Sequence, residues 1–326
     1  MAKGLGTALF VLSFLLVGCT GNVIVEEYRE QGPEPAVYFC IRDDCGRQLE
    51  ALLGKAEKSI HCAFYDLDLK NLISMLGEKS ASVEVKVVLD DEPYSGGLSG
   101  PGVLVEDKPA SRMHNKFCIV DGMYVWTGSF NPTLTDNTQN ENNGVLMSSL
   151  YLARNYEAEF QELWSGEFSG GSLVEYPLFY HNGMMVESLF CPEDGCEERV
   201  ASLVAGAQRS VDAMVFSFTS EAIGDAMLLN AHAKIRGLFD ASQGGSQYSQ
   251  FSRLEGFEMD VRKEKSKGKL HHKVFIIDNM TVVTGSYNPT GSGSSRNDEN
   301  VLILHDERVA KQFSEEFNRL WALNGQ

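Results

Sequence analysis

The sequence is poor in positive charge: 28 Lys and Arg residues stand against 45 Asp and Glu in 326 residues, so the net charge at pH 7 is −17. Such a chain repels polyanions at long range unless its basic residues are gathered locally, which disfavours a general nucleic-acid-coating role. The sequence also lacks carboxylate or histidine clusters with convincing metal-ligand spacing. After residue 18, no apolar run is long enough to span a bilayer. At 43% hydrophobic residues, the chain can still bury a substantial core.

The first 18 residues have the character of a signal peptide. Lys3 precedes a largely apolar run over Leu5–Val17, which is too short for a convincing membrane span. The run ends in Leu16-Val17-Gly18-Cys19, which resembles the lipobox of prokaryotic lipoproteins, where cleavage before the cysteine precedes its lipid modification. An uncleaved anchor helix is the alternative, and both readings place the rest of the chain outside the cytoplasm. We therefore expect lipidation at Cys19, a tether over residues 19–33 and an extracytoplasmic location on the cell membrane.

Six further cysteines fall into two kinds. Cys40 and Cys45 bracket four residues, as do Cys191 and Cys196, so each pair can close a small disulfide loop in an oxidising compartment. A single zinc site made of all four cysteines is the alternative. Cys62 and Cys118 lie in apolar, strand-like runs, and we expect them to be inert core thiols.

The two halves of the chain repeat one another. Tyr38–Tyr65 matches Leu189–Phe216, and each segment is typical of a turn, an amphipathic helix and a buried strand. Later counterparts, such as Trp164 and Trp321, are 157 positions apart. Alternating helices and strands predict an α/β fold of two sandwich half-domains with mixed β-sheets, related by pseudo-two-fold symmetry. We assign residues 34–168 to the first half-domain, 169–184 to a linker and 185–326 to the second half-domain.

Each half carries the same polar residues at the same spacing, His-x-Lys-x4-Asp-x6-Gly-Ser-x-Asn with a glutamate downstream. In the first half they are His114, Lys116, Asp121, Gly128, Ser129, Asn131 and Glu141, and in the second half they are His271, Lys273, Asp278, Gly285, Ser286, Asn288 and Glu299. Because side chains alternate along a strand, the His and Lys of each motif point to one face, and His272 points to the other.

These residue types suit a phosphate ester. The lysines supply positive charge, the Ser and Asn side chains supply neutral hydrogen-bond donors, and each glycine permits close backbone approach. A glutamate that accepts a proton from one imidazole nitrogen fixes the tautomer at the other, as nucleophilic or acid–base catalysis requires.

The repeated motif resembles that of the phospholipase D superfamily, over nearly all of residues 35 to 325. The resemblance implies that both motifs meet at one site between the halves, that neither metal nor cofactor is needed, and that a phosphohistidine forms. By family tendency His114 is the nucleophile and His271 the general acid and base, although the sequence itself is symmetric. The Lys, Asn and Ser residues of both motifs then bind the phosphate, Glu141 and Glu299 orient the imidazoles, and Asp121 and Asp278 brace loops.

Several substrates fit this chemistry. A lipid anchor favours phospholipase D-type cleavage of phospholipid head groups. The compact halves resemble nucleases of the superfamily, and the basic run Arg262–Lys269 could attract an anionic substrate, so a tethered DNA or RNA endonuclease is the alternative. A phosphatidyl transferase of the cardiolipin synthase type ranks third, and a non-catalytic descendant is disfavoured because both motifs are complete. No obligate protein partner is implied, since the two halves already complete one site.

Overall fold

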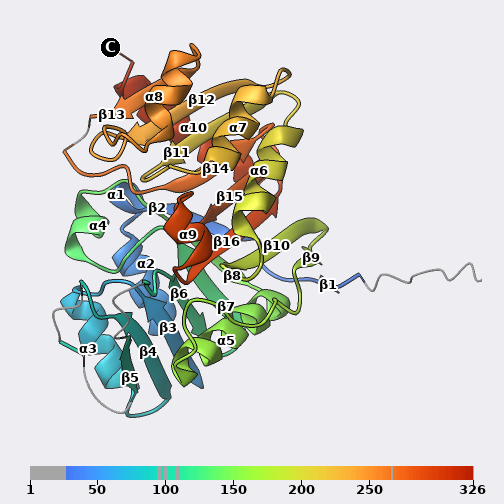
Figure 1. Ribbon diagram of the computed structural model, residues 1–326. Coiled ribbons are helices and arrows are strands. Elements are labelled where there is room, and N and C mark those ends of the chain that lie inside the picture. Colours follow the sequence, from blue (N-terminus) through green and yellow to red (C-terminus); the bar gives the residue numbers. More distant parts are fainter. Residues whose placement is uncertain (1–26, 94–96, 99–101, 107–110, 266, 326) are drawn as a thin grey trace, which may run out of the picture.

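The computed structural model describes residues 27–325 except 94–96, 99–101, 107–110 and 266 (Figure 1). The expected signal peptide and Cys19 lie outside the described residues. Within them, no helix combines the length and the apolar character needed to cross a membrane.

The first half is built around a seven-stranded mixed sheet. Its strands follow the order β2-β8-β7-β6-β3-β4-β5, with parallel pairs from β3 to β5 and antiparallel pairs elsewhere. The strands are β2 (Ala36–Phe39), β3 (Ser59–Phe64), β4 (Glu84–Asp90), β5 (Val103–Glu106), β6 (Lys116–Val120), β7 (Tyr124–Gly128) and β8 (Asn143–Ser148). The helices are α1 (Cys40–Asp43), α2 (Cys45–Leu53), α3 (Lys70–Lys79), α4 (Leu134–Thr138) and α5 (Leu150–Ser165).

The second half repeats this order. Its strands run β10-β16-β15-β14-β11-β12-β13, and β9 and β1 extend the sheet beyond β10. The strands are β1 (Arg29–Glu30), β9 (Leu178–His181), β10 (Met184–Cys191), β11 (Ser210–Val215), β12 (Lys234–Asp240), β13 (Asp260–Glu264), β14 (Lys273–Ile277), β15 (Thr281–Gly285) and β16 (Glu299–His305). The helices are α6 (Cys196–Gly206), α7 (Glu221–Leu229), α8 (Gln250–Gly256), α9 (Gly291–Ser295) and α10 (Glu307–Leu323). The predicted pair of half-domains with mixed sheets is confirmed.

Two long helices join the halves into one body. Helix α5 begins at the Ser149 cap, whose side chain accepts from the Leu152 amide, and its buried stripe includes Tyr156, Phe160 and Leu163. Helices α5 and α10 pack on their own sheets and also contact the other half, at β10 and β2 respectively. A single core cluster accordingly contains residues of both halves, while separate clusters lie under the outer helices. The shared core holds the two motif strands in a fixed relation.

The described part of the expected tether is packed against the fold. Strand β1 pairs in parallel with β9, and Glu30 accepts from the Leu150 amide at 2.8 Å and contacts Nδ1 of His181 at 3.0 Å. The expected linker likewise contains β9 and the first residue of β10. Residues 28–33, which the polar composition assigned to the tether, are therefore packed against the folded body.

Asp121 and Asp278 brace the turns that precede β3 and β11. Each has positive φ (56° and 55°), and the carboxylate of Asp278 accepts from the amides of Gln208, Arg209 and Ser210 at 2.6–3.1 Å. Asp121 accepts from the corresponding three amides of residues 57–59. These backbone hydrogen bonds are the main favourable cause that lowers the pKa of both aspartates, against the opposing effect of partial burial.

Replacing Asp278 with Asn should lower the free energy of unfolding at pH 7 by about 1–3 kcal/mol, because the amide keeps the backbone conformation but loses charge-assisted bonds. A carboxyl whose pKa is lowered by folding stabilises the protein above its unfolded pKa, and this contribution is lost as pH falls through the folded pKa. The difference from the parent should therefore shrink below pH 4, measured by urea denaturation. A loss that is equal at pH 7 and pH 3 would contradict the electrostatic origin; Glu307→Gln is an exposed control.

Three disulfides lie within the described residues. Cys40–Cys45 and Cys191–Cys196 each close a loop, which leaves no thiol of these four cysteines for zinc. Our interpretation of Cys62 and Cys118 as free thiols is wrong, because they form a disulfide between β3 and β6, where they are directly paired in register. The sequence does not show which strands are neighbours. Two buried cysteines 56 residues apart therefore give no sign that they form a disulfide.

The double variant Cys62→Ala/Cys118→Ala should lose about 4 kcal/mol of unfolding free energy, since the bond closes a long loop in the unfolded chain. Cys40→Ala/Cys45→Ala, whose cysteines are five positions apart, should lose about 2 kcal/mol on the same basis. Guanidinium denaturation of both oxidised variants measures the difference. An equal or reversed ranking would argue against loop entropy as the main source of stability.

Candidate active site

A cavity of about 1110 Å³ lies between the two halves and contains both motif histidines in its lining. His114 and His271 each stand two residues before their strands, β6 and β14, and each is 8% exposed. Their neighbours in the lining include Asn131 and Asn288. The structure thus brings the two distant motifs to one site, as the resemblance to the phospholipase D superfamily implied.

Each histidine is held by the backbone of the opposite half. The amide of His114 donates to the carbonyl of Asp298 (2.9 Å), and the amide of His271 donates to the carbonyl of Glu141 (2.9 Å). Side chains add to this exchange: Asn143 donates to Oγ1 of Thr284 (2.8 Å) and Asn300 donates to Oγ1 of Thr127 (2.7 Å). The interface is therefore rigid at the point where the imidazoles must align.

The two motif lysines are buried charges behind the histidines. Nζ of Lys116 donates to the carbonyl of His114 and Nζ of Lys273 to that of His271, both at 2.6 Å. Burial lowers the pKa of Lys116 to about 8, and burial together with the charge of Lys116 holds the pKa of Lys273 well below its ordinary value. Two buried ammonium groups that repel each other lower the stability of the fold. An anion bound in the cavity would offset this repulsion.

Asparagine and serine of each Gly-Ser-x-Asn element take different positions. Asn131 and Asn288 line the cavity, and each has a buried Oδ1 without a partner. Ser129 and Ser286 are fully buried and are not among the lining residues; Oγ of Ser129 donates to Oδ1 of Asn142 at 2.9 Å. The two serines therefore lie behind the cavity lining, where Ser129 holds Asn142. Our prediction instead had both serines contact the substrate phosphate.

The glycines of these elements allow two backbones to touch. Gly128 and Gly285 have φ of +145° and +138°, and a Cβ on either would lie 2.3 or 2.2 Å from the carbonyl oxygen of Asn143 or Asn300. Any side chain there would push apart the two strands that position the site.

Each imidazole has a hydrogen-bond partner behind it, but the two partners differ. Nδ1 of His114 lies 2.8 Å from Oε2 of Glu299, a fully buried carboxyl of the opposite half. Nδ1 of His271 donates to Oδ1 of Asn142 at 2.8 Å, with Oδ2 of Asp136 at 3.6 Å. In both rings Nδ1 is engaged, which leaves Nε2 as the nitrogen available for chemistry.

The role that we expected for Glu141 is wrong. Its Oε2 accepts from Arg319 at 2.9 Å, and the partner of His271 is the next residue, Asn142. The repeat spacing contained the signal, since 157 positions separate Asn142 from Glu299 and Glu141 from Asp298. Residue type alone selects Glu141, which lies one position before the residue that the repeat offset indicates.

Burial dominates the electrostatics of the site. It holds the pKa of both His114 and His271 well below the ordinary value, with the motif lysines adding to the effect. Burial also raises the pKa of Glu299 to about 8. Because Glu299 is hydrogen-bonded directly to His114, the two groups titrate as a coupled pair.

Residues that the motif did not reveal complete the cavity. The rings of Tyr65 and Phe216 lie 4.9 Å from the imidazoles of His114 and His271, respectively. Arg112 and Lys269, 157 positions apart, add positive charge to the lining. Of the basic run, Arg262 and Lys263 instead pack on Trp321 and Phe251. Tyr65 and Phe216 do not stand out in the sequence, because each directly follows an apolar strand and has the character of a core residue.

Metal-ligand geometry occurs elsewhere. Among the described residues, the groups able to hold an ion are Glu141, His272 and Glu316, and Glu159, Glu162 and Glu193; none of these lines the cavity. In the first group Arg319 already pairs with both glutamates. His272 faces away from the cavity, bonds to Asn143 at 3.0 Å, and has its pKa lowered to about 3 by burial.

Comparison with known proteins identifies relatives over most of the chain. The family model described as "Cardiolipin synthase, PLD-like domain" matches residues 49–164 and 200–321. The mitochondrial cardiolipin hydrolase of Xenopus laevis is 34% identical over 136 residues, covering 40% of this chain; the chain spans 65% of that protein's length. The phospholipase D of Rickettsia prowazekii is 31% identical over 173 residues, 52% of this chain and 82% of that protein. The phosphatidylserine synthase of Haemophilus influenzae has the same fold, with a TM-score of 0.66 at 13% identity over 88% of this chain and 86% of that one.

Proposed function

The chain belongs to the family of phospholipase D-like domains, and from this membership we propose that it hydrolyses phosphodiesters without a metal, through a phosphohistidine. The observation that carries the proposal is the pair of histidines facing one cavity, each held at Nδ1 by a partner from the other half. Such pairs present Nε2 in a fixed direction, as a nucleophile and a proton donor on opposite sides of phosphorus require.

In the proposed reaction, Nε2 of His114 attacks phosphorus while His271 donates its proton to the leaving oxygen. The P–O bond breaks as the P–N bond forms. His271, now neutral, takes a proton from water, whose oxygen attacks phosphorus and releases His114. Lys116, Lys273 and the amides of Asn131 and Asn288 stabilise the charge on the nonbridging oxygens.

Phospholipid is the substrate that we favour. The relatives over the matched region include proteins named phospholipase D and cardiolipin hydrolase, and the proposed membrane anchor would hold the cavity near head groups. If Cys19 is lipidated, the residues between it and Arg29 could span at most about 35 Å. Three disulfides support an oxidising, extracytoplasmic compartment.

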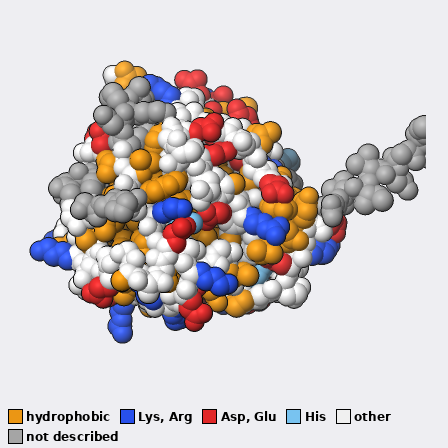
Figure 2. Space-filling model, turned by 90° about the horizontal axis from the view of Figure 1, so that it is seen from below, with side chains coloured by type: hydrophobic (Ala, Val, Ile, Leu, Met, Phe, Trp, Pro, Cys, Tyr) orange, Lys and Arg blue, Asp and Glu red, His pale blue; other side chains and the backbone are white. Residues whose placement is uncertain are grey.

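An endonuclease is the second candidate. Arg112, Lys269 and Arg296 in the lining, with the two rings beside the histidines, could hold a single strand. Against it, the face seen in Figure 2 shows basic side chains scattered among acidic ones, without a continuous basic stripe. The net charge of −17 also opposes a long polyanion.

One assay separates the candidates. Residues 20–326, with EDTA present, are incubated with vesicles of phosphatidylethanolamine, phosphatidylglycerol and cardiolipin, and separately with single-stranded oligonucleotides. Head-group release supports the phospholipase; cleavage of oligonucleotides alone supports the nuclease. Addition of ethanol to the vesicles tests the covalent intermediate, because the alcohol can replace water in the second step and yield the phosphatidyl alcohol; cardiolipin formed in vesicles of phosphatidylglycerol alone would instead indicate a transferase. Activity that EDTA abolishes would contradict the metal-independent mechanism.

A further inference from the structure

The two halves do not supply the same partner to the histidine that they support. Counterparts 157 positions apart place Asn142 where the second half has Glu299, and Asp136 where it has Gly293. Each half therefore contributes one carboxylate near the opposite imidazole, but from different positions. In the first half the carboxylate stands at the start of α4, and in the second half at the start of β16.

The carboxylate of Asp136 lies near Nδ1 of His271, the atom that a glutamate in place of Asn142 would contact. Its Oδ2 accepts from both nitrogens of Asn131 (2.9 and 3.0 Å) and lies 3.6 Å from Nδ1 of His271. Its Oδ1 accepts from Asn140 at 2.6 Å, and the residue is 4% exposed. At position 293 a Cβ would lie 2.3 Å from the carbonyl oxygen of Asn288, so the second half has no room for a side chain there.

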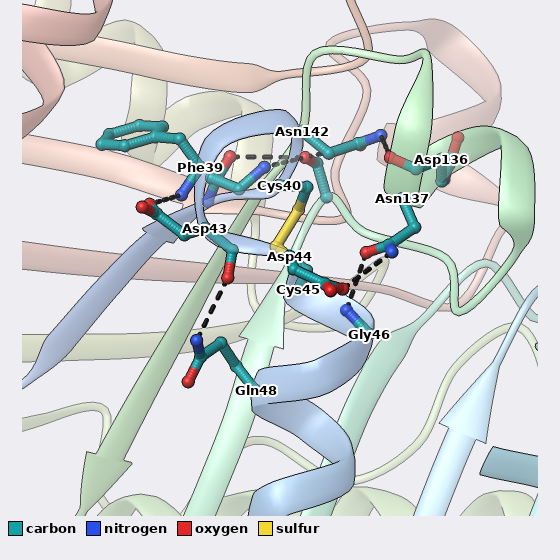
Figure 3. Close-up of a disulfide and its surroundings, with 12 residues drawn as sticks. Phe39, Cys40, Asp43, Asp44, Cys45, Gly46, Gln48, Asp136, Asn137 and Asn142 are labelled. Carbon is teal, nitrogen blue, oxygen red and sulfur yellow. Dashed lines mark hydrogen bonds between the residues drawn. A yellow bond between two sulfur atoms is a disulfide. The ribbon is translucent and has the colours of Figure 1, made fainter. Parts of the chain in front are cut away.

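The loop closed by the Cys40–Cys45 disulfide holds Asn142 and the segment that carries Asp136 in place (Figure 3). The carbonyl of Asn142 accepts from the Cys40 amide at 2.9 Å. Asn137, next to Asp136, accepts from the Gly46 amide and donates to Asp44, both at 2.8 Å. The positions of Asn142 and Asp136 are thus set by a covalently closed loop and not by the flexible end of a side chain.

We propose that Asp136 and Asn142 together replace the glutamate behind His271, and that this exchange makes His271 the proton-transfer histidine and His114 the nucleophile. The inference rests on the proposed function. A carboxyl bonded directly to Nδ1 stabilises the positive charge that the ring of His114 gains when phosphorus binds to Nε2. A neutral amide fixes the tautomer of His271 without retaining its proton, and the carboxylate of Asp136 at longer range keeps the imidazolium accessible.

The charges that surround His271 explain why a second carboxylate is needed. Burial disfavours its protonated form, and so do the charges of Lys273 on β14, Lys116 on β6, His114 and Lys269. The carboxylate of Asp136 on α4 lies 3.6 Å from Nδ1 and carries the opposite charge. Without Asp136, the protonated form of His271 would lose the carboxylate that lies 3.6 Å from its Nδ1. Asp136 is accordingly a positioning residue that acts through His271.

The test compares the parent with Asp136→Asn, Asn142→Glu and the double variant Asp136→Gly/Asn142→Glu, which gives the first half the residues of the second. Substrate is a phosphodiester with an alkyl leaving group, which needs a proton donor, and circular dichroism confirms folding. We expect Asp136→Asn to lower kcat by about 10- to 100-fold with little change in KM, and to move the alkaline limb of the pH profile down by about one unit. Asn142→Glu alone places two carboxyls together and should lose activity, which the double variant should recover to within about 10-fold of the parent.

The inference is overturned if Asp136→Asn keeps the parent's kcat and pH profile, or if the double variant is no more active than Asn142→Glu. Imidazole NMR of the full chain gives a readout that needs no turnover: the pKa of His271 should fall in Asp136→Asn and be unchanged in Glu307→Gln. A further outcome is that the parent cleaves no phosphodiester while the pKa of His271 still falls in Asp136→Asn. That result would reject the proposed function and support the link between Asp136 and His271.

Discussion

Replacement of His114 by Ala should reduce turnover of an aryl phosphodiester at least about 10³-fold, because the variant has no atom to form the bond to phosphorus. The remaining groups can still bind the anion, so KM should change far less than kcat. His114 lies in a preformed interface whose backbone contacts do not use its side chain. The variant should therefore fold, and steady-state release of the phenol measures the loss.

Trapping separates the two histidines. A brief incubation with substrate labelled at phosphorus should place label on the peptide containing His114 in the parent. His271→Ala should retain the label longer, because a phenolate leaves without a proton donor whereas water lacks its base. His232→Ala, at an exposed position away from the cavity, is the control. Label on His271 in the parent, or turnover that survives His114→Ala, would reject the assignment.

The repeat made the fold and the centre of the site predictable. The fixed offset between two His-x-Lys motifs predicted two matching half-domains, and the family resemblance implied that both motifs meet at one site. Alternation along a strand placed His and Lys on one face and His272 on the other. Glycines at 128 and 285 were interpretable for the same reason, because close approach requires a residue without a side chain.

Partners across the chain were not predictable by residue type. Glu141 and Asn142 are adjacent, and only the pairing of the halves decides which one faces an imidazole. Cys62 and Cys118 became a disulfide because β3 and β6 are neighbours, which local sequence does not encode. Ser129 looked like a phosphate ligand, yet the strand carries it beneath the lining, where its hydroxyl holds Asn142. In each instance tertiary contacts decided the role.

Lys116→Met should lower kcat/KM by about 10²- to 10³-fold and at the same time stabilise the protein. Lys116 is 0% exposed, and its pKa of about 8 shows that folding disfavours its charged form. Removing that charge should raise the free energy of unfolding at pH 7 by about 1–3 kcal/mol. The activity falls because the charge that is costly in the empty site is the one that a phosphate requires.

The pH dependence of the free energy of unfolding independently tests whether the charge of Lys116 destabilises the fold. Below pH 8 Lys116 is protonated in both states; between pH 8 and its unfolded pKa the unfolded chain holds more protons, so parent stability should rise with pH across that interval. Lys116→Met should show a smaller rise, to which Lys273 still contributes, whereas the exposed control Lys311→Met should keep the full rise. Activity of the parent should fall over the same interval as the ammonium loses its proton. A variant that is both inactive and less stable would mean that Lys116 is a packing residue, whereas opposite changes in stability and turnover mark a group retained for its charge at a cost to the fold.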